Sequence, residues 1–330
     1  MKNIIFSHES DIDGLGCIVL SKLAFDDIDC ILKENVDKLE KTFRAYIESG
    51  DLNQYHKIYI TDLALYHPSL AMVAKSSLKD KVLVFDHHVS AIKEKLNIYR
   101  FTKIVEEDEK GKRCGTDLFY EYLVNNNLIK TNKAINEFVE LTRLEDTWQW
   151  KKVKNGEKAH DLAILLNIIK TEKYISKMIE RLKNNPENFE FDKKEIRMIK
   201  HKKEEYNKAL KSIMTSAEYF IDENNNKYGM VYANYEYRND LAEYIERNNN
   251  PEEIKYFIVV AMDKGEYGQK SYRSIVQDFD VSEIAMRHGG GGHPSAACVN
   301  ITEEQKAKVS KLTKKEGLKY LANSNYTRRI

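Results

Sequence analysis

Short apolar runs alternate with longer amphipathic segments along the first part of the chain. The runs lie at 3–7, 28–32, 57–61, 81–86 and 99–105, and the amphipathic segments at 15–25, 36–48, 68–76, 116–125 and 133–144. Apolar runs of this length predict strands, and segments of helical periodicity predict helices. Strands that alternate with helices are typical of a parallel sheet with crossover helices. The pattern therefore predicts an α/β fold.

The pattern changes between 174 and 214, where acidic and basic residues are interleaved along a charge-rich helical segment. We interpret it as a solvated connecting helix, because mixed charge on a helix is typical of a face exposed to solvent. Asparagine-rich turns at 184–186 and 224–226 indicate a boundary on each side. Strands return at 228–233, 254–262 and 268–274, with helices at 241–248 and 302–321, and predict a second, smaller α/β unit.

Acidic residues and histidines follow three of the predicted strands. His8, Asp11 and Asp13 follow the first strand, Asp62 follows another, and Asp86-His87-His88 ends a third. Because functional residues of open α/β sheets gather at the carboxyl ends of strands, we expect these side chains at one edge of the sheet. Each has an ordinary alternative, such as a helix cap at Asp13. So many carboxylates would repel one another without a cation, and mixed imidazole and carboxylate donors suit Mn²⁺.

At these residues the sequence resembles the DHH phosphoesterase superfamily, whose name is the triplet Asp86-His87-His88. The resemblance extends to a first motif, Ser7-His8-Glu9-Ser10-Asp11-Ile12-Asp13-Gly14, to a second motif at Asp62, and to a fourth at Asp146. Near the C-terminus, Gly289-Gly290-Gly291-Gly292-His293-Pro294-Ser295-Ala296-Ala297 resembles the glycine-rich motif of the DHH-associated substrate domain. His8 stands three residues before Asp11, whereas many members have four, so this sequence departs from the family at that point.

The resemblance implies a centre of two divalent metal ions, with Mn²⁺ as the expected metal. One ion would be held by His8, Asp11 and Asp62, and the other by Asp13, Asp62, His87 and Asp146. Asp62 would bridge the two ions. The expected catalytic residues are His88, which would donate a proton or hydrogen bond to the substrate, and Asp86, which would orient an imidazole.

The second unit is expected to bind the substrate. By resemblance, Arg273, Ser295, His293 and the backbone of Gly290, Gly291 and Gly292 would hold a phosphate group. The glycine run, followed by the small residues Ser295-Ala296-Ala297, predicts a close backbone approach to an anion at the start of a helix. A flexible glycine loop and a solvent-facing arginine are the alternatives.

The family resemblance implies a DHH catalytic domain at 1–183, a helical linker at 184–226 and a DHH-associated domain at 227–330, with the active site in the cleft between the domains. The length of 330 residues and a hydrophobic content of 42% are ample for two cores. Charge is balanced, with 53 Lys and Arg against 52 Asp and Glu, whereas proteins that bind long nucleic acids usually carry a basic excess.

Neither a membrane span nor a signal-peptide core is visible in the sequence, and the four cysteines are dispersed, as in proteins of a reducing compartment. We therefore expect a cytoplasmic protein without a membrane partner. The oligomeric state stays open, a homodimer included.

Within the superfamily, the sequence is most similar to the nanoRNases, in a subgroup also described as cyclic-nucleotide phosphodiesterases. The expected activity is hydrolysis of short oligoribonucleotides to mononucleotides, with no role on long nucleic acid. Alternative substrates are cyclic mono- or dinucleotides and 3′-phosphoadenosine 5′-phosphate. A nucleotide-sensing module without catalysis is an alternative of another class.

Overall fold

The computed structural model describes residues 2–250, 252–263 and 266–323. It divides into two compact units, Met1–His201 and Lys202–Ile330. The division falls inside the long charge-rich helix α9 (Lys193–Met214). The three-part division with a linker at 184–226 stays a prediction, and most of the predicted tail at 323–330 lies outside the described residues. No helix among the described residues is both long and apolar enough to cross a membrane.

The first unit contains a parallel sheet with the strand order β2-β1-β3-β4-β5. Its strands are β1 (Asn3–His8), β2 (Ile28–Lys33), β3 (Ile58–Thr61), β4 (Val82–Asp86) and β5 (Thr102–Ile104). This confirms the predicted α/β fold, although the strand predicted at 99–105 is shortened to β5. The chain leaves β1 towards one side and returns on its other side as β3, so the sheet has a topological switch point between these strands, where ligands of such folds bind.

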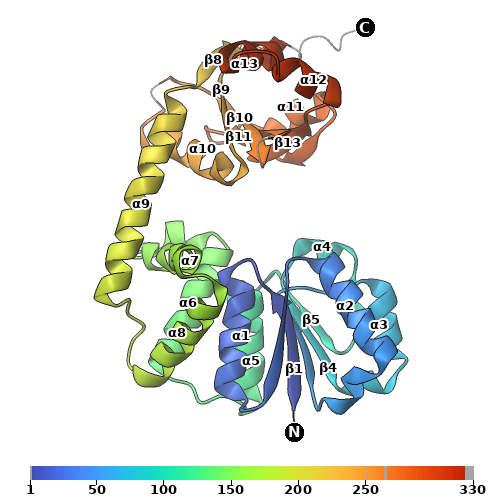
Figure 1. The fold of residues 1–330 in the computed structure, drawn as a ribbon. Coiled ribbons are helices and arrows are strands. Elements are labelled where there is room, and N and C mark those ends of the chain that lie inside the picture. Colours follow the sequence, from blue (N-terminus) through green and yellow to red (C-terminus); the bar gives the residue numbers. More distant parts are fainter. Residues whose placement is uncertain (1, 251, 264–265, 324–330) are drawn as a thin grey trace. The chain divides into compact units, whose positions relative to one another are not determined.

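Helices cover both faces of this sheet, because alternate strand residues are apolar on both faces. Helices α1 (Ile12–Ala24) and α5 (Gly115–Asn125) lie on one face, and α2 (Val36–Ser49) and α3 (His67–Ala74) on the other (Figure 1). Ile5 and Tyr59 pack towards α1 and α5, whereas Ile4 and Ile58 pack into the core that includes α2 and α3. The short helix α4 (Val89–Lys93) follows β4, and β6 (Glu107–Asp108) and β7 (Gly111–Lys112) form a small hairpin before α5.

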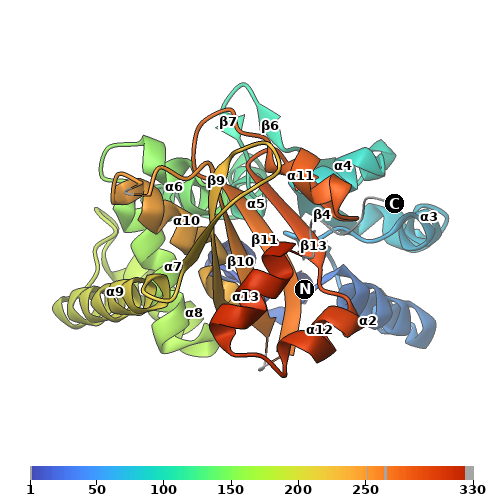
Figure 2. The same cartoon turned by 90° about the horizontal axis from the view of Figure 1, so that it is seen from above.

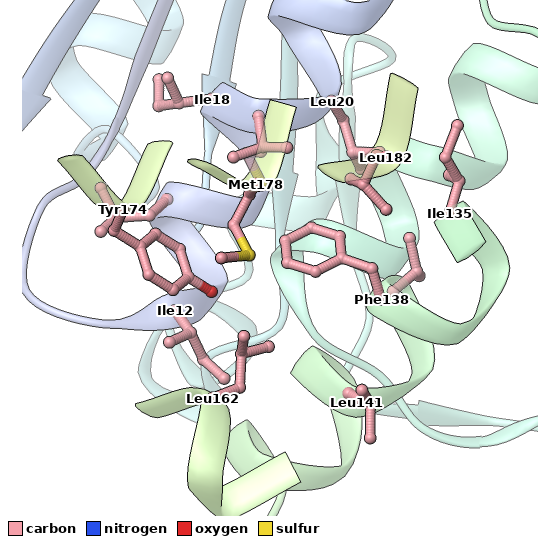
Figure 3. Packing of buried hydrophobic residues seen from close by; sticks show 14 of the residues in the cluster. Ile12, Ile18, Leu20, Ile135, Phe138, Leu141, Leu162, Tyr174, Met178 and Leu182 are labelled. Carbon is pink, nitrogen blue, oxygen red and sulfur yellow. The ribbon is translucent and has the colours of Figure 1, made fainter. Parts of the chain in front are cut away.

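Three further helices extend the core on the α1 side: α6 (Lys133–Asp146), α7 (Glu157–Ile169) and α8 (Thr171–Asn184). Figure 3 shows Ile12 of α1 in the same cluster as Phe138 of α6, Leu162 of α7 and Met178 of α8. The sequence analysis predicted α6 but not α7. Asp146 is the last residue of α6.

The second unit has a mixed sheet with the order β12-β13-β11-β10-β9-β8. Its strands are β8 (Glu218–Ile221), β9 (Lys227–Asn234), β10 (Tyr256–Asp263), β11 (Glu266–Ser274), β12 (Gly291–His293) and β13 (Ala296–Asn300). Helix α10 (Arg238–Arg247) packs on one face, and α11 (Val281–Arg287), α12 (Glu303–Val309) and α13 (Lys314–Asn323) belong to the core on the other. Figure 2 shows α12 and α13, in red, over the strands.

Two predictions for this unit are wrong. The segment Ser295-Ala296-Ala297 does not begin a helix, because Ala296 begins strand β13, whose Ala297 and Val299 alternate into the core. The predicted single helix at 302–321 is two helices, and the side chain of Thr313 accepts from the backbone N–H of Glu316 where α13 begins. A threonine that caps a new helix ends the previous one, and apolar periodicity alone does not reveal this.

Candidate active site

His87 lies at the centre of a group of carboxylates at the carboxyl edge of the first sheet. Its Nε2 atom is 3.4 Å from Oδ1 of Asp62, 3.4 Å from Oδ2 of Asp146 and 3.6 Å from Oδ2 of Asp13. His8 lies beside them, with Nδ1 at 2.7 Å from Oδ2 of Asp11 and 3.4 Å from Oδ2 of Asp62. The six residues expected to hold metal are therefore close together in the structure.

Local structure explains how three of these carboxylates are presented. Asp11 caps α1, because its Oδ1 accepts from the N–H of Gly14 at 3.0 Å, and this leaves Oδ2 directed to His8. Asp62 follows β3 with φ of 55°, a left-handed conformation that is uncommon outside glycine. Such strain at a non-glycine residue is often found at functional sites. Asp146 comes from the end of α6 rather than from a strand.

Asp13 is held by the first turn of α5. Its Oδ2 accepts from the N–H of Gly115 at 2.6 Å, and its Oδ1 accepts from the N–H of Thr116 at 2.7 Å. The hydroxyl of Thr116 also donates to the carbonyl of Asp13 at 2.5 Å. The sequence analysis missed Gly115 and Thr116. A glycine followed by threonine at the start of a predicted helix was the available signal, but it does not reveal which carboxylate the helix meets.

Three sets of ligand atoms lie within 4.8 Å of one another: His8 with Asp11 and Asp62, Asp13 with His87 and Asp146, and Asp62 with His87 and His88. Four of the ligand atoms are buried and have no hydrogen bond of suitable geometry, although each lies within ion-pair distance of another member of the group: Nδ1 of His8, Oδ2 of Asp62, Nε2 of His87 and Oδ2 of Asp146. Buried polar atoms normally have a partner, because an unpaired one costs about 1–3 kcal/mol. These atoms are close enough together to hold a metal ion, and their imidazole and carboxylate donors fit a divalent cation.

The charges of the group shift its pKa values strongly. Burial raises the pKa of Asp146, and Asp13 and Asp62 raise it further, to about 9, against the opposing effect of His87. Burial and the neighbouring Asp13 and Asp11 also raise the pKa of Asp62 well above its usual range. For His8, burial lowers the pKa, but Asp11 and Asp62 bring it to about 11. In the protein without metal these side chains therefore hold protons, and the binding of cations would release those protons.

Asp86 and His88 form a pair beside this group. Oδ1 of Asp86 lies 2.7 Å from Nδ1 of His88 and accepts from the N–H of His87 at 2.9 Å. Asp86 is 1% exposed, whereas the side chain of His88 is about half exposed, at 47%. The hydrogen bond of Asp86 raises the pKa of His88, although burial opposes it. The geometry places Asp86 where it orients the His88 ring and leaves Nε2 of that ring available.

In the second unit, the glycine-rich segment approaches strand β13 rather than a helix terminus. A Cβ atom on Gly290 would lie 2.0 Å from the carbonyl oxygen of Cys298, and one on Gly292 would lie 2.5 Å from that of Ala296. Gly291 has open space around it. The glycines thus allow two strands to approach each other here, and the predicted approach to an anion stays a prediction. Gly291, Gly292 and His293 form β12, and Ser295 lies in the turn to β13.

Arg273 and His293 lie in one row across the sheet. Both are register partners of Ala296, Arg273 from β11 and His293 from β12. Directly opposed residues of antiparallel strands project to the same face, so the two side chains share the face on which α10 packs. Nε of Arg273 donates to Oδ1 of Asn239 at 2.9 Å, and Nη1 donates to the carbonyl of Tyr272 at 2.7 Å. His293 is exposed.

Comparisons with known proteins give the chain a family. It is 32% identical over 308 residues to the oligoribonuclease NrnB of Bacillus subtilis. The aligned region spans 91% of this chain and 73% of that protein. No model of a protein family matches the sequence.

Two solved structures show the same fold. One is the DHH domain of a protein described as a member of a family of ribosomal proteins, with a TM-score of 0.58, 15% identity, and coverage of 96% of this chain and 87% of that one. The other is a pGpG-specific phosphodiesterase from Vibrio, with a TM-score of 0.54, 13% identity, and complete coverage of both chains.

Proposed function

The chain belongs to the DHH phosphoesterase family, in its oligoribonuclease branch, and is a phosphodiester hydrolase. From this premise we propose that it cleaves short oligoribonucleotides to mononucleotides at a centre of two divalent ions. The observation that carries the proposal is the group of four buried ligand atoms on His8, Asp62, His87 and Asp146, which lie close together without hydrogen bonds of suitable geometry. A nucleotide-sensing module would not need this arrangement of unsatisfied donors.

The proposed ligands follow the grouping of the side chains. His8, Asp11 and Asp62 hold one ion, and Asp13, Asp62, His87 and Asp146 hold the other. Mn²⁺ is the proposed metal, because the donors mix imidazole with carboxylate. When bound, two such ions lower the pKa of a water molecule and stabilise the charge on the reacting phosphate.

The protein side chains supply the other parts of the reaction. His88, oriented by Asp86, donates a hydrogen bond to a phosphate oxygen or a proton to the leaving ribose oxygen. Asp13, fixed through both oxygens, keeps its ligand position without reorganisation. His88 also lies within reach of the set formed with Asp62 and His87, so a role as a ligand is the competing assignment.

The proposed role of the second unit is to hold a phosphate that does not react. Arg273 offers a planar, charged fork, and His293 lies in the same row of the sheet. The exposed side chains of His293 and Ser295 complete this site in our proposal, together with the backbone of Gly290, Gly291 and Gly292. The relative named as an oligoribonuclease supports RNA as the substrate, and the balanced charge of the chain supports short pieces of it.

The test is hydrolysis of a 5′-labelled RNA dinucleotide by the full chain with Mn²⁺ and with EDTA. We expect mononucleotides with Mn²⁺ only. Asp13→Asn should abolish the reaction, whereas Asp26→Asn, an exposed aspartate away from the sheet edge, should retain it. Cyclic AMP, cyclic di-AMP and 3′-phosphoadenosine 5′-phosphate are assayed beside the dinucleotide. Faster turnover of one of these would replace the proposed substrate, and hydrolysis that persists in EDTA would exclude the metal mechanism.

A further inference from the structure

Trp148 lies two residues after Asp146, the proposed metal ligand at the end of α6. Its backbone N–H donates to the carbonyl of Glu145 at 3.0 Å, so the chain turns directly as it leaves the helix. Consecutive Cα atoms are 3.8 Å apart, so the Cα atoms of Asp146 and Trp148 are separated by no more than about 7.6 Å. The Trp148 side chain therefore starts beside the proposed metal centre.

The backbone of Trp148 has a conformation that is unfavourable for a large side chain. Its φ of 57° and ψ of 18° lie in the left-handed region, which glycine or asparagine usually occupies after a helix. Among the described residues, no other aromatic residue has a positive φ. Strain of this kind is often found at functional sites, and it suggests that the ring supplies something that glycine or asparagine would not.

The ring of Trp148 does not serve the core. Trp148 is 52% exposed, whereas Trp150, two residues later, is 7% exposed and belongs to the core of the first unit. The Trp150 ring stacks on the ring of His160, with centroids 4.7 Å apart and an angle of 9° between the planes. Trp150 thus anchors this segment, and Trp148 stays at the surface.

The exposed ring is supported on one side. Nζ of Lys151 lies over it, 5.1 Å from the ring centre. The next residue, Gln149, accepts from Nη1 of Arg143 at 2.6 Å, which ties the segment to α6. Since the ammonium group covers one face of a half-exposed ring, the other face is open to solvent. An aromatic ligand would meet a surface already held in place, and binding would cost little conformational freedom.

We infer that the open face of Trp148 stacks on a base of the substrate, next to the phosphate held at the metal centre. Every nucleobase offers an aromatic face, so this contact favours nucleotides over simpler phosphodiesters without selecting a sequence. The position beside Asp146 favours the substrate over a partner protein as the occupant of this face. The inference rests on the proposed function in that it takes an oligonucleotide as the ligand, and it adds a residue that binds a base.

The first experiment uses the fluorescence of the full chain, which contains only two tryptophans. The ligand is an adenosine dinucleotide whose bridging ester oxygen is replaced by methylene, so that it is not hydrolysed, and it is titrated at a fixed concentration of Mn²⁺. Stacking of adenine on Trp148 should quench the emission. The quenching should persist in Trp150→Phe and disappear in Trp148→Phe, where only the buried Trp150 emits.

The second experiment measures hydrolysis, with Mn²⁺, of an adenosine dinucleotide and of two analogues that each lack one base. Trp148→Ala should lower kcat/KM for the dinucleotide by about ten-fold, chiefly through a higher KM, as is typical for the loss of one stacked base. The wild type should lose a similar factor when the stacked base is removed from the substrate. Trp148→Ala should lose nothing further on that analogue, because the contact is already absent.

Trp148→Asn separates the ring from the backbone. Asparagine tolerates the left-handed conformation, so this variant should unfold at the same temperature as the wild type or at a higher one. It should nevertheless show the same loss of kcat/KM as Trp148→Ala. The matched control is Val153→Ala, which removes an apolar side chain of the same segment that is 41% exposed, and it should keep wild-type kinetics.

An unquenched wild type would overturn the inference, as would quenching that survives in Trp148→Phe. Losses that simply add when the ring and the base are both removed would also overturn it, because the two would then act independently. If such losses accompany a change in the oligomeric state of Trp148→Ala, measured by light scattering, the ring contacts another chain instead. If the wild type cleaves none of the dinucleotides, the proposed function fails, whereas the fluorescence titration still decides the role of Trp148.

Discussion

The backbone N–H of Gly115 donates to Oδ2 of Asp13 at 2.6 Å, although 102 residues separate them in the sequence. Thr116 binds the other carboxylate oxygen in the same way. The orientation of Asp13 is therefore set by the N-terminus of α5, whose free N–H groups and positive dipole end favour a carboxylate. Asp13 lies near the start of α1, yet its orientation depends on α5, which follows the last strand of the sheet.

We expect Gly115→Ala to impair the site. A Cβ atom on Gly115 would lie 2.8 Å from Cβ of Asp62 and 3.0 Å from Oδ2 of Asp13, so the two carboxylates must move apart from α5. Overpacking of this kind costs about 1–3 kcal/mol in unfolding free energy. Mn²⁺ affinity and turnover should both fall. The control is Gly268→Ala, where the nearest atom would be 3.8 Å away. Unchanged Mn²⁺ affinity in Gly115→Ala would contradict the role of α5.

The sequence predicted the strands of the first unit well, because their apolar runs are bounded by polar residues and both sheet faces are buried. It also predicted that His8, Asp11, Asp13, Asp62 and His87 lie at one edge of the sheet, because the carboxyl ends of parallel strands lie at the same edge. It could not predict how α5 meets Asp13, because that contact is made by backbone groups, which leave no side-chain pattern.

The second unit was predicted less accurately because its glycine-rich segment has two physical uses. Glycines allow an anion to approach a helix terminus, and they also allow two strands to lie very close together. The second use applies at Gly290 and Gly292, whose missing side chains make room for the carbonyls of Cys298 and Ala296. Sequence alone does not distinguish the two, because both require a missing side chain and neither requires a particular neighbour.

Asp62→Asn should remove hydrolysis and weaken the binding of both ions, because Asp62 belongs to the set with His8 and Asp11 and also lies against His87. The substitution keeps the size of the side chain and replaces a carboxyl group whose ionised form is disfavoured by burial and by Asp13 and Asp11. In EDTA the variant should therefore be at least as stable as the wild type. Elemental analysis of manganese per chain and thermal unfolding in EDTA check both points. Two Mn²⁺ retained per chain would contradict the shared position of Asp62.

The stability of the metal-free protein should fall as the pH rises. Asp146 has its pKa raised from 3.8 to about 9, so between these values the folded chain holds a proton that the unfolded chain releases. His8, with a pKa raised from 6.5 to about 11, acts in the same direction over a higher range. A state that binds more protons is favoured at low pH, and this stabilisation is lost as the pH rises through the folded values.

Thermal unfolding in EDTA between pH 6 and pH 9 checks this dependence, and Asp146→Asn should flatten it. Mn²⁺ should reverse the trend, because cation binding releases these protons and becomes stronger as the pH rises. A stability that increases with pH in EDTA would show that these groups are not protonated in the folded protein.

His88→Ala should lose turnover while it retains both ions. Nδ1 of His88 is paired with Asp86, and we assign the remaining nitrogen to the substrate. Loss of a proton donor typically lowers kcat by about 10²–10⁴-fold. Manganese content and kcat are measured on the same preparation. If one ion is lost together with activity, His88 is a ligand, in agreement with its position beside Asp62 and His87, and its assignment to the substrate is wrong.

The last prediction separates the reacting phosphate from the one that is held. Arg273→Ala and His293→Ala should each reduce kcat/KM for a dinucleotide by about 2–3 kcal/mol, or roughly 30- to 150-fold, through the loss of a charged contact. Bis-p-nitrophenyl phosphate has no second phosphate, so its slow hydrolysis should fall much less in these variants, whereas Asp13→Asn should eliminate the hydrolysis of both substrates. Circular dichroism and thermal unfolding of each variant check that the fold is retained. Equal losses on the two substrates by a folded Arg273→Ala variant would mean that Arg273 acts at the reacting phosphate, and the proposed division between the two units would be wrong.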